Sequence, residues 1–523
     1  MSSQKGPYEL KIEPELINDP QAISDLFKKR FPQVASRWAD LALTRRSIDA
    51  RFGKPQYILR FEFAEKQDES SLSHLYIDAT KAPVHIIGAG PAGYFAALTL
   101  LTKGIKPIVF DRGKDAQSRR RDLRAIMQDS IVNPDSNYCF GEGGAGTYSD
   151  GKLYTRSTKR GNIRTVLNTF CSYGADGDIL VNANPHIGSN KLPKIIEAMR
   201  KAILDAGGEI HFNKKLEDFK RTGDQITELH FQDGEVQPCS KVILATGHSA
   251  RDIFTLLHER QVLLEAKAFA MGARVEHSQQ TIDQLQYHCS TRPDNLPAAA
   301  YSVVTQVDGR GVFSFCMCPG GMIVPSATAP GEIVMNGMSP SRRDSPYANS
   351  GLVTSVELAD IPSEFGDSPL RAMYFQQHSE QMFFQHGDGS QQAPAQLLTD
   401  FVLQKHSSIL PASSYVPGIY PADLNHLLPA SISVRIRTGV KMIGNKMRGY
   451  LSEDAVIVGL ESRTSSPVRI PRDKITLLHP QVSNLYPCGE GAGYAGGIVS
   501  AAIDGMKIAE QIIENRRLEI RSI

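Results

Sequence analysis

Residues 83–111 read PVHIIGAGPAGYFAALTLLTKGIKPIVFD, and this stretch decides the fold. An apolar run at residues 84–87 predicts a buried strand, a glycine turn follows, and the apolar residues of 94–102 recur with the period of a helix. A second apolar run then ends in Asp111, roughly 20 residues after Gly88, as dinucleotide-binding folds require. A glycine turn alone also occurs where a helix packs closely on a strand, but the complete unit favours a Rossmann-type dinucleotide site.

The glycine turn of this unit is predicted to hold a pyrophosphate. Its first glycine permits the tight turn, its second lets backbone N–H groups approach the phosphates, and its third lets the helix lie close on the strand. The phosphates would then sit at the positive N-terminus of the helix. The acid at Asp111 disfavours a bound 2′-phosphate, so FAD or NAD is expected rather than NADP. The binding residues predicted in this turn are Gly88, Ala89, Gly90, Pro91, Ala92 and Gly93.

Composition and charge limit the class of protein. The 523 residues are 41% hydrophobic, which predicts a globular chain of several domains. Lys plus Arg (58) nearly balances Asp plus Glu (56), so the chain has no overall attraction for nucleic acid or an anionic membrane. Without a targeting or membrane-spanning segment, we expect a soluble cytoplasmic protein. The seven cysteines form no CxxC pair, and no metal-ligand cluster is visible, so we expect reduced thiols and no metal.

The predicted fold class is α/β, with four segments in the chain. Residues 1–80 form a small α+β N-terminal domain, and residues 81–266 form the first part of the dinucleotide-binding domain. Residues 267–460 form an inserted substrate domain built on an antiparallel sheet, and residues 461–523 return to the first core. Strands at 214–219, 225–231 and 241–244 predict a three-stranded antiparallel insertion, and residues 393–404 have a helical pattern.

Other glycine-rich segments follow the first unit. FGEGGAGTYSDGKL at residues 140–153 and GEGAGYAGGIVSAAIDG at 489–505 contain too many small residues for a helix or strand interior. Such backbone passes close to a flat ring or an anion, although a tight loop packed on protein is the alternative. Backbone donors at Gly497 and Ile498 suit the pyrimidine end of a flavin. Arg112 and Arg119 follow Asp111 and are predicted to reach the adenosine or the pyrophosphate, although a solvated helix end is the alternative for such a charge cluster.

These motifs, with ATGHSARD at 245–252, SFCMCPGG at 314–321 and RTSSPVRIPRD at 463–473, together resemble a known family. They are similar to the uncharacterised FAD-dependent dehydrogenase family within the glutathione-reductase-like FAD-binding superfamily. The resemblance covers residues 81 to the end and implies FAD as the cofactor, but it implies no substrate.

The resemblance also assigns residues by position. It places Asp111 at the ribose, residues 144–147 at the flavin and Leu216 beside the adenine. Gly489 and Glu490 take the place of the usual glycine–aspartate pair at the ribityl chain. The remaining predicted cofactor-binding residues are Gly143, Gly144, Ala145, Gly146, Thr147, Lys152, Ala245, Thr246, Gly247 and Gly496.

Cys316, Cys318 and His248 are the candidates for catalysis. The two cysteines are predicted to share one face of a strand, as a redox pair or as two inert buried thiols. His248 is either a proton donor or a structural histidine. We expect hydride transfer between flavin N5 and a small-molecule organic substrate, with NAD(P)H as a transient donor because only one complete dinucleotide fingerprint is present.

Two other functions stay open. The basic residues of the N-terminal domain favour a solvated face, but they also suit an RNA- or protein-modifying flavoenzyme that docks through this domain. The third hypothesis is a flavin-binding protein without turnover. For the leading hypothesis, an oxidoreductase acting on a small molecule, we expect no nucleic-acid or membrane partner. No feature of the sequence predicts the oligomeric state.

Overall fold

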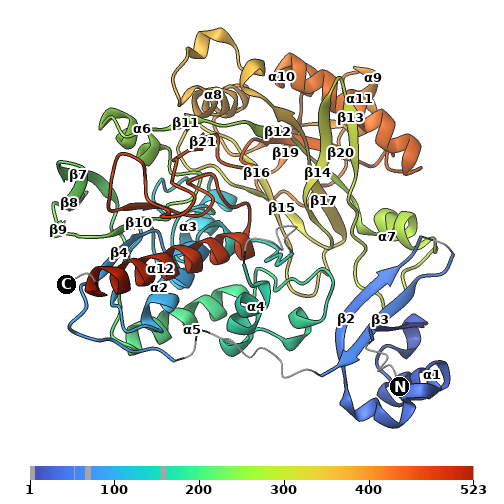
Figure 1. The fold of residues 1–523 in the computed structure, drawn as a ribbon. Helices are drawn as coiled ribbons and strands as arrows, with labels where there is room; N and C mark the ends of the chain where they lie inside the picture. Colours follow the sequence, from blue (N-terminus) through green and yellow to red (C-terminus); the bar gives the residue numbers. More distant parts are fainter. Residues whose placement is uncertain (1–5, 52, 65–71, 73, 155–160, 522–523) are drawn as a thin grey trace.

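Three parts make up the chain in the computed structural model, which describes residues 6–51, 53–64, 72, 74–154 and 161–521. Figure 1 shows a parallel sheet packed with helices, a larger sheet beside it with a helical cover, and a small N-terminal sheet at one side. No helix within these described ranges is long and apolar enough to cross a bilayer.

The parallel sheet has the strand order β22, β10, β4, β5, β6, and every pairing in it is parallel. Its strands are β4 (Val84–Ile87), β5 (Pro107–Phe110), β6 (Glu209–His211), β10 (Val242–Leu244) and β22 (Leu485–Pro487). All residues of β4, β5, β10 and β22 are buried, as expected where both faces of a parallel sheet are covered. The predicted α/β, Rossmann-type class is therefore confirmed.

Helices cover this sheet. The almost wholly apolar α2 (Pro91–Leu101) connects β4 to β5 and packs along α12 (Ile498–Arg521), which Figure 1 shows in red crossing the front of the sheet. The other helices of this part are α3 (Ala116–Gln128), α4 (Ile163–Ser172), α5 (Leu192–Asp205) and α6 (Arg251–Glu259). Helix α12, which follows the larger sheet in the chain, thus packs on the first βαβ unit.

The antiparallel insertion differs from its prediction in one strand. It consists of β7 (Leu216–Thr222), β8 (Gln225–Phe231) and β9 (Val236–Pro238). The third predicted strand, residues 241–244, instead contains β10 of the parallel sheet. Its continuous apolar run is typical of a strand buried on both faces, whereas β9 is short and half exposed and carries little hydrophobic signal.

The larger sheet is mostly antiparallel and has the order β13, β14, β17, β12, β20, β18, β19. Its strands are β12 (Phe269–Ser278), β13 (Val304–Val307), β14 (Arg310–Cys318), β17 (Tyr347–Val356), β18 (Ala393–Leu397), β19 (Ile419–Pro421) and β20 (Val456–Glu461). A separate pair is formed by β15 (Met322–Pro325) and β16 (Met335–Met338). The helices of this larger part are α7 (Gln279–Tyr287), α8 (Arg371–Gln385), α9 (Leu398–Leu403), α10 (Leu424–Leu427) and α11 (Ala430–Lys446).

The predicted helix over residues 393–404 is wrong in its first half. Residues of β18 form a strand that pairs with β19 and β20, and only α9 is helical. Because β18 is almost completely buried, it has no amphipathic period by which strand and helix can be told apart.

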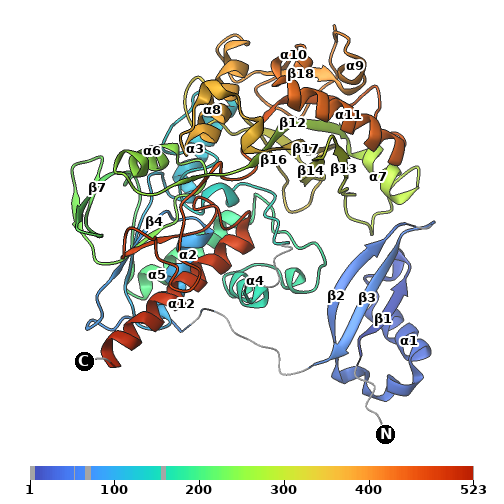
Figure 2. The ribbon, with the colours of Figure 1, turned by 45° about the horizontal axis from the view of Figure 1, so that its top comes forward.

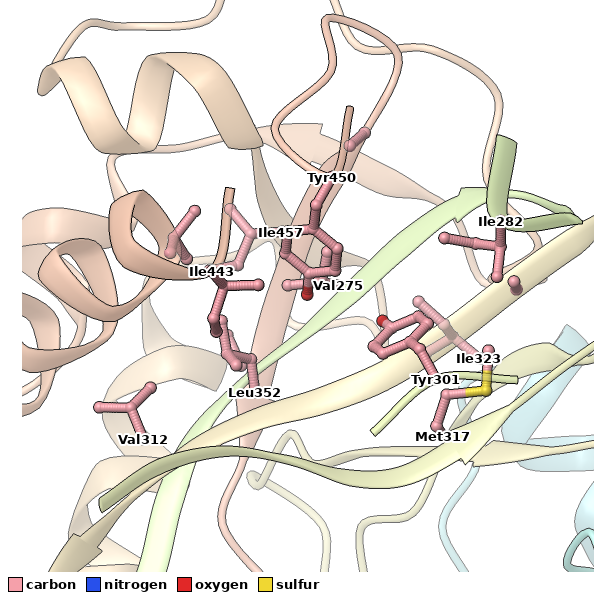
Figure 3. Packing of buried hydrophobic residues seen from close by; sticks show 14 of the residues in the cluster. Val275, Ile282, Tyr301, Val312, Met317, Ile323, Leu352, Ile443, Tyr450 and Ile457 are labelled. Carbon is pink, nitrogen blue, oxygen red and sulfur yellow. The ribbon is translucent and has the colours of Figure 1, made fainter. Parts of the chain in front are cut away.

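The core of this part lies between the sheet and α11. Figure 3 shows Val275 and Leu352 from the sheet, Ile443 from α11 and the ring of Tyr450 packed together. All four side chains are at most 1% exposed. The larger sheet and α11 are therefore joined by a fully buried apolar layer.

The N-terminal domain contains β1 (Tyr8–Ile12), α1 (Pro20–Arg30), β2 (Leu41–Asp49) and β3 (Gln56–Phe63), with the order β1, β3, β2. Figure 2 shows it beside the rest of the molecule. The backbone of Arg46 bonds to Val181 and Ala183, and its guanidinium pairs with Asp178 at 2.6 Å. One of the basic residues that suggested an anionic partner is thus used to attach this domain.

Candidate functional site

Four glycine-containing loops meet at one edge of the parallel sheet. Because β4, β10 and β22 are parallel neighbours, the loops that begin at residues 88, 245 and 488 leave the same edge. The Gly143 N–H donates to Ala89 O at 2.8 Å and adds the loop of residues 141–147. The structure therefore brings together the glycine segments that the sequence singled out.

Glycine is required where these loops touch. A Cβ on Gly88, whose φ is +111°, would lie 2.3 Å from Ala245 O. A Cβ on Gly491 would lie 2.6 Å from Gly247 O, and one on Gly93 would lie 1.9 Å from Gly88 O. Any side chain at these positions would force the loops apart.

The surface between the loops fits a dinucleotide. A Cβ added to Gly90 would meet only the Cα of Gly144, at 4.0 Å, and α2 begins there without a side-chain cap. The uncapped N–H groups of a helix start suit a pyrophosphate. Beside Gly247, Gly496 and Gly497 there is no atom within 4 Å of an added Cβ, which leaves room for a ligand that extends along this edge.

The start of α12 lies next to the second glycine loop. A Cβ on Gly146 would meet the side chain of Ile498 at 3.0 Å, and Gly496 and Gly497 are exposed. Ala145 is exposed and Thr147 is buried, with its hydroxyl donating to Glu142 O. The predicted ring contacts at residues 144–147 and 497–498 thus come from adjoining surfaces.

Asp111 holds the first glycine turn in place. Its carboxylate accepts the N–H of Ala89 and that of Gly113, each at 2.8 Å, and it is 8% exposed. Each oxygen keeps further acceptor capacity for a ribose hydroxyl. Leu216, the predicted adenine neighbour, begins β7 just after Lys214, whose N–H donates to Asp111 O. Its side chain is 7% exposed within an apolar cluster.

The prediction that Arg119 contacts the cofactor is wrong. Its guanidinium has no exposed surface and donates to four backbone carbonyls, which belong to Asn137 (2.8 Å), Tyr138 (3.1 Å), Glu142 (2.7 Å) and Gly144 (2.9 Å). Arg119 therefore positions the second glycine loop from beneath.

Arg112 is also engaged by the protein. It donates to Asp135 at 2.7 Å and to Asp252 at 2.8 Å, and its guanidinium lies over the ring of Phe140. It braces the glycine-loop segment against α6.

The two cysteines do not share a face. The register of β14 shifts between Phe315 and Cys318, and Cys316 has a φ of +42°. This bulge leaves Cys316 exposed while Cys318 is 1% exposed. The alternation of an undisturbed strand fails where a bulge inserts a residue. Lys152 donates to Met317 O within the bulge and so connects the second glycine loop to the larger sheet.

A buried ion pair supports the bulge from behind. Arg274 lies 2.6 Å from Glu461, and the same guanidinium donates to Cys316 O at 2.6 Å. Burial raises the pKa of Glu461, and the charge of Arg274 opposes that effect. Sequence reasoning missed this pair, although an arginine inside the apolar strand 269–275 was a signal for it.

His248 lies against Glu490. The His248 Nδ1 is 3.3 Å from the Glu490 Oε1, and the two side chains are 13% and 26% exposed. One comes from the loop after β10 and the other from the loop after β22. The structure therefore brings together two predicted site residues that the sequence placed in different roles.

Lys267 lies beside this pair, directly after β11 (Glu265–Ala266). The chain passes between the two larger parts at β11 and again at β21 (Val468–Arg469), and these two short strands pair with each other. Burial lowers the pKa of Lys267, with Arg469 adding to the effect and Glu490 opposing it. Basic and acidic groups thus converge at the edge of the site.

A second buried network joins the two larger parts. Arg463 lies 2.8 Å from Glu332 and 2.7 Å from Glu380, and Arg251 lies 2.9 Å from each of these carboxylates. Burial alone would raise the pKa of Glu380, but the two guanidinium groups outweigh it and hold the pKa at about 2. These residues are structural, and within the ranges described above no three His, Cys, Asp or Glu side chains gather as a metal site.

Comparisons with known proteins identify relatives. A domain described as "FAD-dependent protein, C-terminal domain-like" matches residues 268–464. A Clostridium beijerinckii protein, described as an uncharacterized protein, is 42% identical over 440 residues, which cover 83% of this chain and 81% of the relative.

Solved structures of flavoproteins are more distant. CtdE in complex with FAD is 10% identical, with 84% of this chain and 92% of that chain covered and a TM-score of 0.32. A putative FAD-containing monooxygenase from Photorhabdus luminescens is 12% identical, with coverage of 83% and 89% and a TM-score of 0.37. By its sequence identity to the Clostridium protein and by the domain at residues 268–464, the chain belongs to the FAD-dependent protein family.

Proposed function

We propose that the protein is an oxidoreductase that binds FAD along the edge formed by its four glycine loops. The observation that carries this proposal is their meeting at the carboxyl ends of β4, β10 and β22, with contacts that only glycine permits. In open parallel sheets, ligands bind in the crevice at this edge. The family to which the chain belongs supports FAD as the ligand.

Different groups of the chain bind different parts of this ligand. Backbone N–H groups at the start of α2 bind the pyrophosphate, and Asp111 accepts a ribose hydroxyl while it holds the turn. Backbone N–H groups at Gly497 and Ile498 lie at the positive start of α12, where negative charge on the pyrimidine end of the ring is stabilised.

FAD supplies, when bound, a centre at N5 that accepts or donates a hydride. Glu490 orients the His248 ring through Nδ1, which leaves Nε2 to hold or release a proton at the cleft. Cys316 is the other candidate group, since it is exposed in the bulge of β14 that Lys152 joins to the second glycine loop, but the protein packed around its thiol raises the pKa to about 11 and so disfavours the thiolate. The substrate is a small organic molecule, and NAD(P)H enters the same cleft as a transient donor.

The test begins with FAD uptake by the purified protein. We expect the protein to take up FAD and its flavin absorbance to bleach when NADH or NADPH is mixed in without oxygen. Failure to take up FAD would contradict the whole proposal, whereas uptake without reduction by either donor would favour a flavin-binding protein without turnover.

The role of the His248–Glu490 pair is tested by pH. We expect His248→Asn to retain FAD, to slow flavin reduction and to change the pH profile of that reduction, since it removes the imidazole Nε2 that holds or releases the proton. His258→Asn is the control because His258 is exposed on α6. An unchanged pH profile in His248→Asn would assign a purely structural role to the pair.

A further inference from the structure

An apolar groove of about 320 Å³ lies between α3 and the loop that precedes β19. Leu123 and Met127, one helical turn apart on α3, form one side of it. Tyr148 and Val416 from the other elements complete its apolar surface. The volume falls at the lower end of the range for small-molecule sites.

Two exposed arginines also line this groove. Arg120 and Arg124 lie four residues apart on α3, so that their side chains point to the same side of the helix. Among the residues that the structure describes, neither forms an ion pair, whereas Arg112, Arg251 and Arg463 all bind carboxylates. Two like charges at this spacing destabilise a helix, and a bound anion would relieve that repulsion.

The two guanidinium groups are already oriented. Arg124 donates through Nε to Gln128 Oε1 at 2.6 Å, which leaves its terminal nitrogens for a ligand. Arg120 bonds to the side chain of Tyr148, whose hydroxyl donates to Ala116 O. A planar guanidinium binds a carboxylate through two parallel hydrogen bonds, so two of them one helical turn apart at the same groove suit a carboxylate ligand.

The groove adjoins the glycine loops. Tyr148 directly follows Thr147, and α3 is attached beneath the same loop through Arg119. A ligand in the groove would therefore lie beside the loop to which we assign the flavin.

We propose that this groove binds a free medium-chain carboxylate. Its apolar chain lies against Leu123, Met127 and Val416, and its carboxylate lies between Arg120 and Arg124. The binding does not depend on whether FAD is bound, so it stands or falls separately from the proposed function.

Calorimetric titration of the full-length protein with decanoate tests this. We expect one site, with decan-1-ol and decyltrimethylammonium binding roughly tenfold or more weakly, because each lacks the charge-assisted hydrogen bonds. The double variant Arg120→Gln, Arg124→Gln should lose affinity for decanoate to the same extent. Val416→Asp should also weaken binding by placing a carboxylate against the chain.

Arg121→Gln is the matched control, since Arg121 is exposed on the same helix but does not line the groove. It should bind decanoate as the unmodified protein does. Equal affinity for decanoate in the double variant, or equal binding of all three decyl compounds, would overturn the proposal. Binding to anionic phospholipid vesicles without binding of free decanoate would overturn it in favour of a membrane surface.

Discussion

Replacing Arg119 by methionine removes the charged group on which the second glycine loop rests. The side chain donates to four carbonyls of residues 137–144 and has no exposed surface. Methionine fills much of the same volume, so the change mainly deletes the hydrogen bonds and leaves buried carbonyls without donors.

The magnitude follows from these contacts. Hydrogen bonds to charged groups contribute about 1.5–3 kcal/mol each, but such values are not additive within one network. Leaving a buried carbonyl without a donor costs about 1–3 kcal/mol, and with four carbonyls affected in one network we expect Arg119→Met to lower the free energy of unfolding by about 3–5 kcal/mol. A loss of this size is a large fraction of the roughly 5–15 kcal/mol that stabilises a typical protein.

The assay is denaturant unfolding followed by circular dichroism, together with the FAD content of the folded protein. We expect reduced FAD retention because the carbonyls of Glu142 and Gly144 shift with the loop. Arg121→Met, an exposed neighbour on α3, should change stability by less than about 0.5 kcal/mol. If Arg119→Met unfolded within about 0.5 kcal/mol of the unmodified protein and kept its FAD, the assignment of Arg119 as the support of the loop would be refuted.

Three further predictions concern other sites. Gly93→Ala should abolish FAD uptake, since its Cβ would lie 1.9 Å from a carbonyl oxygen, whereas Gly311→Ala, with no atom nearer than 3.6 Å, should keep the flavin absorbance. Burial raises the pKa of Asp360, but hydrogen bonds from two arginines outweigh it and bring the pKa to about 2. Asp360→Asn should therefore lower the unfolding free energy by about 2 kcal/mol at pH 7, a difference that fades in denaturant curves as pH falls from about 4 toward 2. A maleimide should modify Cys316 faster than Cys318 in peptide mass spectra, and equal rates would contradict the exposed bulge.

Some parts of the site depend on local rules that a sequence displays. The turn at Gly88 needs a positive φ, Gly93 needs a close approach of helix and strand, and Asp111 ends the next strand; each requirement acts over a few residues. The other glycine segments also follow such local rules, because runs of residues without side chains indicate a close approach of backbone to a neighbouring loop or a ligand.

Other parts depend on contacts between distant residues. Whether Arg119 faces a ligand or the protein is decided by carbonyls that the loop turns toward it, and no spacing encodes that choice. Likewise, a bulge in β14 separated the two cysteines, and the burial of β18 on both faces hid its strand period.

The amino-acid sequence by itself determined the Rossmann unit, the α/β class and the glycine positions, because each of these follows from short-range sterics and hydrophobic period. Only the tertiary structure decided which charged side chains bond to other groups of the protein and which remain available to a ligand. That choice separates Arg119 from Arg120, which are neighbours in the chain but point in directions about 100° apart around α3, so that the first is buried and the second exposed.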